Sequence, residues 1–258
     1  MTKELLNSVV ISNEFTRYGI FDFTVTEWRI FLYAVSKIRP DHFILPQQEI
    51  RLRDFCTMFK ISSYADVRNA CRNLETKTIT VKDKKYQIFN YCVCSDNVIS
   101  FQIHDDISEF LLEQYENMTI FDLGYISTLA SKYALRMYLY VCSFKKLNRY
   151  NMSVKTLIKI MNSYRTASEV TRRILAPALK EINEKTNLKF CVKRNMDRFH
   201  FYCRERYASE IAKMNIDDWR VAAEEDKKNS AVDFEELEKE LFKEEIAENE
   251  RLSFFVCE

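Results

Sequence analysis

The feature that most constrains the fold is one pattern that occurs twice, once in each half of the chain. Residues 29–36 (RIFLYAVS) align with residues 136–143 (RMYLYVCS) at an offset of 107 residues. At an offset of 108, amphipathic positions also match in the same order: Val67, Ala70, Arg72, Leu74 and Lys77-Thr78 with Leu175, Ala178, Lys180, Ile182 and Lys185-Thr186. Chance similarity between amphipathic helices is the alternative, but order and spacing are shared over most of both halves. The repeat therefore predicts a duplicated domain.

The second copy contains a predicted helix that begins near residue 166 and is followed by a basic hairpin. At 100° per residue, an apolar face lies opposite a face of cations, an amide and a small side chain. The apolar face holds Val170, Ile174, Leu175, Ala178, Leu179 and Ile182, and the opposite face holds Arg172, Arg173, Ala176, Lys180 and Asn183. Residues 188–193 and 199–204 alternate like strands around the turn 194–198. A solvated face is the simpler interpretation of the helix alone, but helix and charged hairpin together are typical of a DNA-binding winged helix.

The first copy predicts the same order of elements. Thr24 and Glu27 have capping-box spacing ahead of an apolar periodic stretch, so a helix is expected to run to about Ile38. Two further helices are expected over residues 54–60 and 64–75, and they form a helix-turn-helix. The second of these buries Val67, Ala70, Cys71 and Leu74 and presents Arg68, Asn69, Arg72 and Asn73 on the other side.

The remaining elements follow from shorter patterns. Strands are expected at 8–11, 49–52, 79–81, 86–94 and 98–103, and helices at 105–114, 126–144 and 153–161. Pro177 interrupts the helix of the second copy, so we expect a kink or an irregular turn there. Such a bend would aim Arg172 and Arg173 at a DNA groove, unless packing simply absorbs it.

Length and charge extend this interpretation to the whole chain. The 258 residues suffice for two domains and a tail, and 47% hydrophobic residues can form cores. Residues 1–208 carry 32 basic and 22 acidic side chains, whereas residues 209–258 carry 7 and 16. We therefore predict an α+β, helix-rich fold with two tandem winged-helix domains related by internal duplication, over residues 1–117 and 118–208. An acidic C-terminal tail, partly helical or disordered, would follow over residues 209–258.

The sequence argues against catalysis, cofactors and membrane insertion. Two glycines provide no phosphate-binding loop, and no apolar run approaches a membrane span. The eight cysteines form no CxxC pair, so reduced core thiols and a cytoplasmic location are expected, without a metal site. A rolling-circle nuclease would need a His-hydrophobic-His metal motif and a nucleophilic tyrosine, but His42, His104 and His200 are far apart. We predict a non-enzymatic protein without cofactors.

Three stretches resemble the initiator replication proteins of theta-replicating plasmids, which bind iteron repeats at the origin. The stretches are residues 27–36 (EWRIFLYAVS), 131–140 (SKYALRMYLY) and, most specifically, 172–186 (RRILAPALKEINEKT). The resemblance covers roughly residues 5–205 and implies two duplicated winged-helix domains. It also implies that Arg172, Arg173 and Lys180 lie on the iteron-reading helix, and that Arg68 and Arg72 contact DNA from the first domain. The short 162–166 turn and the acidic tail depart from the family pattern.

The resemblance further implies the partners and the mechanism. Dimers, in equilibrium with monomers, would repress their own promoter, and monomers would open the origin and recruit host replication proteins such as a helicase or its loader. No membrane partner is expected. Double-stranded DNA would be bound through Lys and Arg on phosphates and through a helix in the major groove. The candidate DNA-binding residues are Tyr64, Arg68, Asn69, Arg72, Lys77, Arg165, Ser168, Arg172, Arg173, Lys180, Asn183, Lys193, Arg194 and Arg198.

Two other functions remain open at this stage. A winged-helix transcriptional repressor without an initiator role would use the same helices, and only affinity for directly repeated rather than inverted sites separates the two. A protein-interaction scaffold would show no salt-dependent DNA binding. The tail has three interpretations: a solvated tail, a competitor of DNA for the basic face, or an apolar stripe that docks a host protein.

Overall fold

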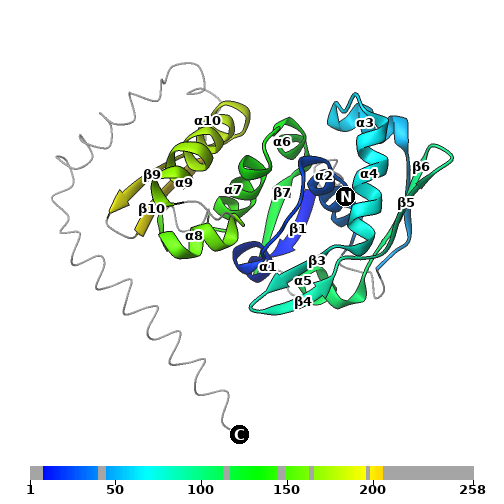
Figure 1. Cartoon of the computed structure of the whole chain (residues 1–258), viewed down its shortest axis with the longest axis horizontal. Helices are drawn as coiled ribbons and strands as arrows, with labels where there is room; N and C mark the ends of the chain where they lie inside the picture. Colours follow the sequence, from blue (N-terminus) through cyan, green and yellow to red (C-terminus); the bar gives the residue numbers. More distant parts are fainter. Residues whose placement is uncertain are drawn as a thin grey trace, which may run out of the picture. The chain divides into compact units, whose positions relative to one another are not determined.

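The computed structural model describes residues 8–39, 45–112, 117–144, 149–162, 166–195 and 198–205 (Figure 1). These residues all belong to one unit, Met1–Arg206. The acidic tail predicted for residues 209–258 lies outside the described residues.

The first half of this unit is a winged helix. Its sheet has the order β2-β6-β5, with both neighbouring pairs antiparallel, and the hairpin β3–β4 is inserted before β5. Its elements are β1 (Ser8–Ser12), α1 (Asn13–Tyr18), α2 (Val25–Val35), β2 (Gln48–Arg51), α3 (Leu52–Phe59), α4 (Tyr64–Thr76), β3 (Thr78–Val81), β4 (Lys84–Gln87), β5 (Phe89–Ser95), β6 (Val98–Ile103), η2 (Asp105–Ile107) and α5 (Glu109–Leu112).

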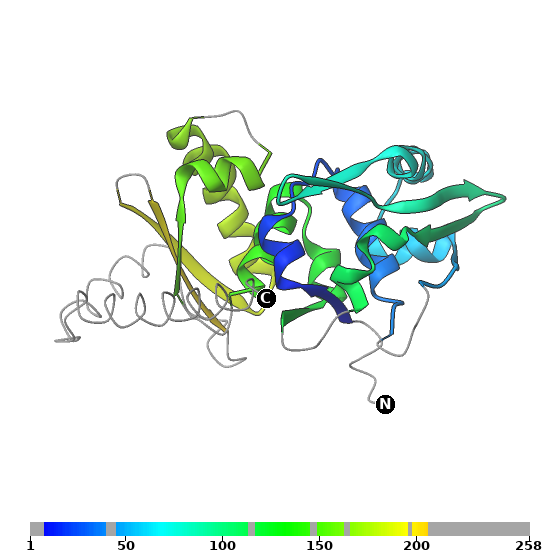
Figure 2. The same ribbon diagram turned by 90° about the horizontal axis from the view of Figure 1, so that it is seen from below.

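The second half repeats this topology. Its sheet, green to yellow in Figure 2, has the order β8-β10-β9, so in each three-stranded sheet the first strand along the chain pairs with the last one. Its elements are β7 (Met118–Asp122), α6 (Leu123–Thr128), α7 (Lys132–Cys142), β8 (Arg149–Ser153), α8 (Val154–Ile160), α9 (Ala167–Val170), the π-helical turn η5 (Thr171–Leu175), α10 (Ala176–Lys185), β9 (Leu188–Asn195) and β10 (Arg198–Glu205). The predicted duplication is confirmed.

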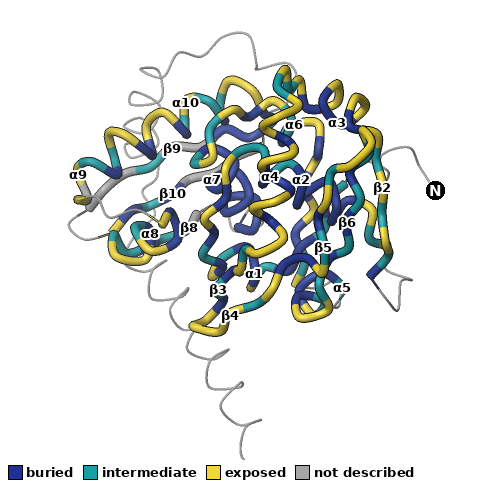
Figure 3. Tube along the Cα trace, turned by 45° about the vertical axis from the view of Figure 1, so that its right-hand side comes forward, coloured by how far each residue is buried: buried dark blue, intermediate teal, exposed yellow. Residues whose placement is uncertain are grey.

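The repeated stretches form the central helices α2 and α7, which end in the same way. Ser36 Oγ donates to the Tyr33 carbonyl at 2.6 Å, and Ser143 Oγ donates to the Tyr140 carbonyl at 2.7 Å. The residue types that recur at the offset of 107 therefore recur in their contacts. Both helices are buried along most of their length (Figure 3), because both belong to one hydrophobic core that continues from the first half into the second.

The predicted capping box of α2 is present. Thr24 Oγ1 accepts a hydrogen bond from the Glu27 amide at 3.3 Å, and the Glu27 carboxylate accepts one from the Thr24 amide at 2.7 Å. Aromatic rings gather beside this helix, with Trp28 only 4.7 Å from Phe21 and 4.9 Å from Phe23 between ring centroids. The first turn of α2 is thus fixed by both hydrogen bonds and packing.

Several predicted elements differ from the observed ones. The single helix expected over 126–144 is two helices, because the Ser131 hydroxyl caps a new helix, α7. The single strand expected over 86–94 is divided at Ile88, whose carbonyl accepts from the His104 amide outside both ladders. The helix expected over 105–114 is, within the described residues, a 3₁₀ turn followed by the four-residue α5. α1, β7 and β8 were not predicted.

The two halves meet through an antiparallel pair of strands, β1 and β7. Val10 lies opposite Ile120, and Ser8 opposite Asp122. In the duplication, each position of β1 is equivalent to the position 110 residues later in β7. The same shift relates the residues that cap the next helices, Ser12 of α1 and Asp122 of α6. A self-complementary pairing of this kind is the geometry of a two-fold interface, formed here within one chain. It joins the two predicted domains on either side of residue 117.

Candidate nucleic-acid interface

The candidate DNA-binding helix of the second half, which runs through α9, η5 and α10, begins with a reciprocal cap between Thr166 and Glu169. The Glu169 amide donates to Thr166 Oγ1 at 3.4 Å, and the Thr166 amide donates to Glu169 Oε2 at 3.3 Å. This arrangement satisfies amides at the start of α9. The helix therefore has a defined beginning just before its cationic residues.

The irregular turn expected at Pro177 is confirmed as the π-helical turn η5. The Ala176 amide donates to the Thr171 carbonyl, five residues back. Pro177 has no amide to donate, and its ring crowds the carbonyl four residues earlier, so a wider preceding turn accommodates it. The proline then sits in the first turn of α10, where a missing amide costs little.

The two faces of this helix agree with the prediction. Val170, Ile174, Leu175, Ala178 and Ile182 are buried. On the opposite side the exposed residues are Arg172, Arg173, Ala176, Pro177 and Lys180. Cationic side chains therefore flank a small apolar patch formed by Ala176, which was predicted to lie on this face, and Pro177, which was not.

The other candidates of the second half are distributed around this helix. Ser168 is exposed and Asn183 is half-buried. Arg198, at the start of β10, is exposed and lies opposite Asn195 in the hairpin. Lys193 and Arg194 belong to β9, but their side chains are outside the described residues, as is the whole of Arg165. The structure thus places Arg198 at the tip of the predicted wing.

In the first half, α4 presents the predicted polar face. Tyr64 is 42% exposed, and Arg68, Asn69 and Arg72 are all exposed. Arg72 Nη2 donates to Asn69 Oδ1 at 2.8 Å, one turn earlier on the same helix. This hydrogen bond holds the guanidinium over the helix surface.

Lys77 differs from the other candidates because its ion-pair partner is buried, whereas the Arg173 guanidinium lies 4.0 Å from a carboxylate oxygen of the part-exposed Glu169. Lys77 Nζ lies 2.7 Å from Oε2 of Glu27, which is fully buried, and it also donates to the Asp22 carbonyl. Asn73 Nδ2 donates to the other oxygen of Glu27 at 3.1 Å. Lys77 stays a predicted DNA contact, but the structure gives it a clear role as the counter-ion of a buried carboxylate.

The wings of the two halves differ in charge. The wing of the first half is the hairpin of β5 and β6, which turns at Asp96 and Asn97 with φ values of 48° and 61°. Asn97 Oδ1 accepts from Arg68 Nη2 at 3.3 Å, and its carbonyl accepts from the Leu52 amide at 2.8 Å. This tip is bonded to α4 and to the start of α3, whereas the second wing carries Arg198. The two halves therefore offer different surfaces to a ligand.

The described residues contain no group of three or more His, Cys, Asp or Glu side chains placed to hold a metal ion. In the same part of the chain, no helix is long and apolar enough to cross a membrane. What the arrangement offers chemically is two exposed helices with guanidinium and ammonium groups, which suit phosphate oxygens and base edges.

Comparison with known proteins agrees with both halves. Residues 8–142 match the family model described as "Initiator Replication protein, WH1", and residues 153–201 match "Initiator Rep protein, WH2". A replication initiation protein of Escherichia coli is 22% identical over 193 residues. That alignment covers 67% of this chain and 61% of the relative, so the chain spans less than two thirds of its length.

A solved structure shares the fold. The crystal structure of Pi initiator protein in complex with iteron DNA superposes with a TM-score of 0.65. The superposition covers 80% of this chain and 100% of that chain, at 15% sequence identity.

Proposed function

Because the chain belongs to the initiator replication protein family, as its WH1 and WH2 matches show, we propose that it initiates plasmid replication by binding directly repeated origin DNA. The observation that carries the proposal is the exposed cationic face on the equivalent helix of both winged-helix halves, α4 and α10. The DNA-bound Pi initiator, which has the same fold, supports it.

Binding would need two kinds of contact. Lysine and arginine release counterions from phosphates and give affinity that falls with salt. Sequence would be read in the major groove, where Arg172 or Arg173 of η5 suits guanine and the exposed Ala176 suits a thymine methyl group. Arg68 and Arg72 of α4 would add contacts one domain away.

Initiation would then follow from binding energy, without a catalytic step. Several chains on tandem sites would strain the neighbouring duplex and open it, and host proteins such as a helicase or its loader would enter there. We propose that the protein works in the cytoplasm as a non-enzymatic factor, with a homodimer in equilibrium with the initiating monomer. Dimers would repress the promoter.

The test is selection of sites from random duplexes by the full-length chain, followed by titration at several salt concentrations. We expect specific binding with a steep salt dependence, and replication of a plasmid that carries the gene and its flanking DNA. An absence of salt-dependent DNA binding would refute the proposal.

A winged-helix repressor is the second candidate, because α4 and α10 would serve it equally well. Arrays of the selected site in direct and inverted orientation separate the two functions. An initiator favours direct repeats and supports replication, whereas a repressor favours inverted pairs and only lowers transcription.

A further inference from the structure

Arg29, which begins the first copy of the repeated stretch, reaches from α2 into the second half. Its Nη2 donates to the Leu129 carbonyl at 3.0 Å and to the Ser127 carbonyl at 3.3 Å. These carbonyls end α6, and helix C-termini attract cations. One guanidinium thus binds two backbone carbonyls, two residues apart, in the segment that leads into α7.

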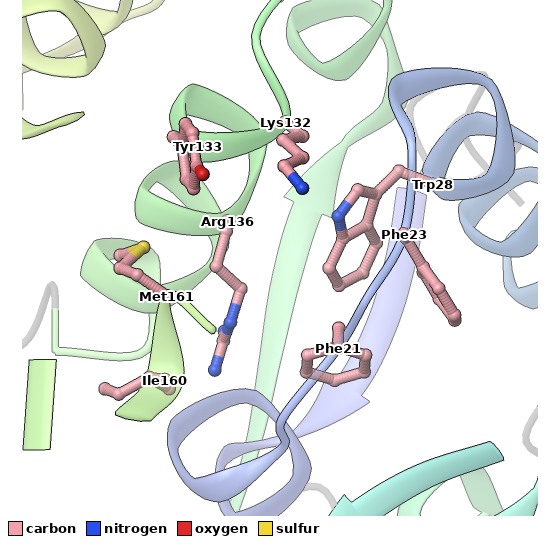
Figure 4. Close-up of a pocket in the computed structure, with 8 residues that line it drawn as sticks. All are labelled: Phe21, Phe23, Trp28, Lys132, Tyr133, Arg136, Ile160 and Met161. Atoms are coloured by element: carbon pink, nitrogen blue, oxygen red, sulfur yellow. The ribbon is translucent and has the colours of Figure 1, made fainter. Parts of the chain in front are cut away.

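Arg136, the equivalent residue of the second copy, makes the reciprocal contact. From α7 it donates to the Thr16 carbonyl at 2.6 Å and to the Gly19 carbonyl at 2.8 Å, at the end of α1. Its guanidinium lies 4.9 Å from the centroid of the Phe21 ring, and both side chains are drawn in Figure 4. Burial lowers the pKa of Arg136 to about 10, so it is still charged at neutral pH. Each half therefore contacts the other through the arginine that begins its repeated stretch, and Arg17 of α1 adds a second contact from the first half by donating to the Ser143 carbonyl.

The Arg29 contact continues to the candidate reading helix α10. Glu181 of α10 accepts a hydrogen bond from the Ala130 amide at 2.6 Å, and Ala130 directly follows Leu129. Lys185 holds the same carboxylate oxygen at 2.8 Å. Burial lowers the pKa of Arg29, and the charge of Glu181 acts in the opposite direction, which places the two groups in one electrostatic network. The segment between α6 and α7 is thus bound from both sides.

We propose that Arg29 and Glu181 are positioning residues that fix the separation and angle of α4 and α10, and so set the spacing of the DNA sequence that one chain reads. The inference rests on the proposed function. Its physical basis is geometric. The planar guanidinium of Arg29 binds two carbonyls of the segment, and the carboxylate of Glu181 binds the next amide, that of Ala130. Together these contacts allow little sliding between α2 and α10. Neither side chain needs to touch DNA for this role.

The proposal predicts how the chain responds to altered spacing. One inserted base pair increases the separation of the two contact patches on the DNA by about 3.4 Å and rotates one patch by roughly 35° relative to the other. A rigid pair of reading helices then loses about tenfold or more in affinity, comparable to the loss of one base-pair contact. A loosened pair follows the displaced patch and loses much less.

The experiment uses the full-length chain and a site selected by it. Footprinting locates the two contact patches, and duplexes with zero, one or two base pairs inserted between them are titrated. The variants are Arg29→Met, Arg29→Lys and Glu181→Met, the last of which removes the acceptor of the Ala130 amide. Lys37→Met, which removes an exposed cation just after α2, is the matched control. Because Arg136 is buried and its loss endangers folding, it is left intact.

We expect the unmodified chain and Lys37→Met to discriminate strongly against insertions. Arg29→Met and Glu181→Met should bind the uninserted site but lose most of that discrimination, and Arg29→Lys, which reaches one carbonyl instead of two, should be intermediate. Discrimination that is unchanged in both Arg29→Met and Glu181→Met would overturn the positioning role alone. A lack of site-specific binding by the unmodified chain would instead overturn the proposed function and this inference with it.

Discussion

Replacing Lys77 with methionine separates its two possible roles, as a DNA contact or as the counter-ion of Glu27. The ammonium lies 2.7 Å from a carboxylate with no solvent exposure, while the lysine side chain is itself 26% exposed. Breaking a buried ion pair by removing one partner costs about 3–5 kcal/mol. Glu27 keeps its hydrogen bonds from Thr24 and Asn73, and water can approach where the lysine was. We therefore expect a loss of about 2–3 kcal/mol in the free energy of unfolding.

Thermal and urea unfolding followed by circular dichroism measure this loss. For a domain of this size it corresponds to a melting temperature lower by roughly 5–10 °C. Lys82→Met is the control, because its ion pair with Glu14 is of similar length, 2.9 Å, but both side chains are about half exposed. That pair is expected to contribute about 0–1 kcal/mol. Adding Glu27→Gln to Lys77→Met should recover much of the stability, because no unpaired charge stays buried.

The reasoning fails if Lys77→Met unfolds like Lys82→Met while binding selected DNA several-fold more weakly. Lys77 would then be a DNA contact whose pairing with Glu27 contributes little to folding. A stable, DNA-competent Lys77→Met variant would show that neither role matters.

Further predictions concern the candidate DNA-binding helices and the tail. If Arg172 and Lys180 read bases, Arg172→Ala and Lys180→Ala should each cost about 1–3 kcal/mol of specific binding and relax the specificity. If they bind phosphate, both substitutions should lower the affinity for all duplexes and give a shallower salt dependence. Unchanged titrations against selected and scrambled duplexes would remove this helix from the interface. Combined Arg68→Ala and Arg72→Ala should shorten the footprint at one end of the site, whereas a full footprint at normal affinity would count against α4. Truncation after Tyr207 should speed and tighten DNA association at low salt if the acidic tail competes with phosphate, or abolish replication with unchanged DNA binding if the tail docks a host protein. If both survive truncation, the tail has neither role.

The sequence was informative wherever a local pattern determines the structure. The capping box of Thr24 and Glu27, the apolar face of α10 and the irregular turn before Pro177 depend on residues within a few positions of one another. The duplication was also recognisable, because equivalent residues such as Val67 and Leu175 are buried for the same reason in both halves. Periodicity and spacing suffice for features of this kind.

What the sequence did not reveal depends on distant partners. A strand was expected at 8–11, where β1 lies, but β7 and its pairing with β1 were not predicted, because the two five-residue segments are about 110 residues apart. Lys77 and Glu27 are 50 residues apart, so a helix projection alone could not show that this lysine faces a buried carboxylate. The contacts of Arg29 and Arg136 were missed too, although an arginine at the start of both repeated stretches was a visible signal.

The strand pair β1–β7 gives the chain the symmetry of a dimer without the identity of its two subunits. In a true homodimer, one sequence must serve both DNA-binding heads, so the preferred DNA site is a palindrome. Joining the two copies in one polypeptide removes that requirement, because α4 and α10 are free to diverge while the interface keeps its two-fold geometry. A single chain of this design, bound to DNA as proposed, would have a direction along the duplex. Its sites would then follow one another head to tail, each marking the same direction.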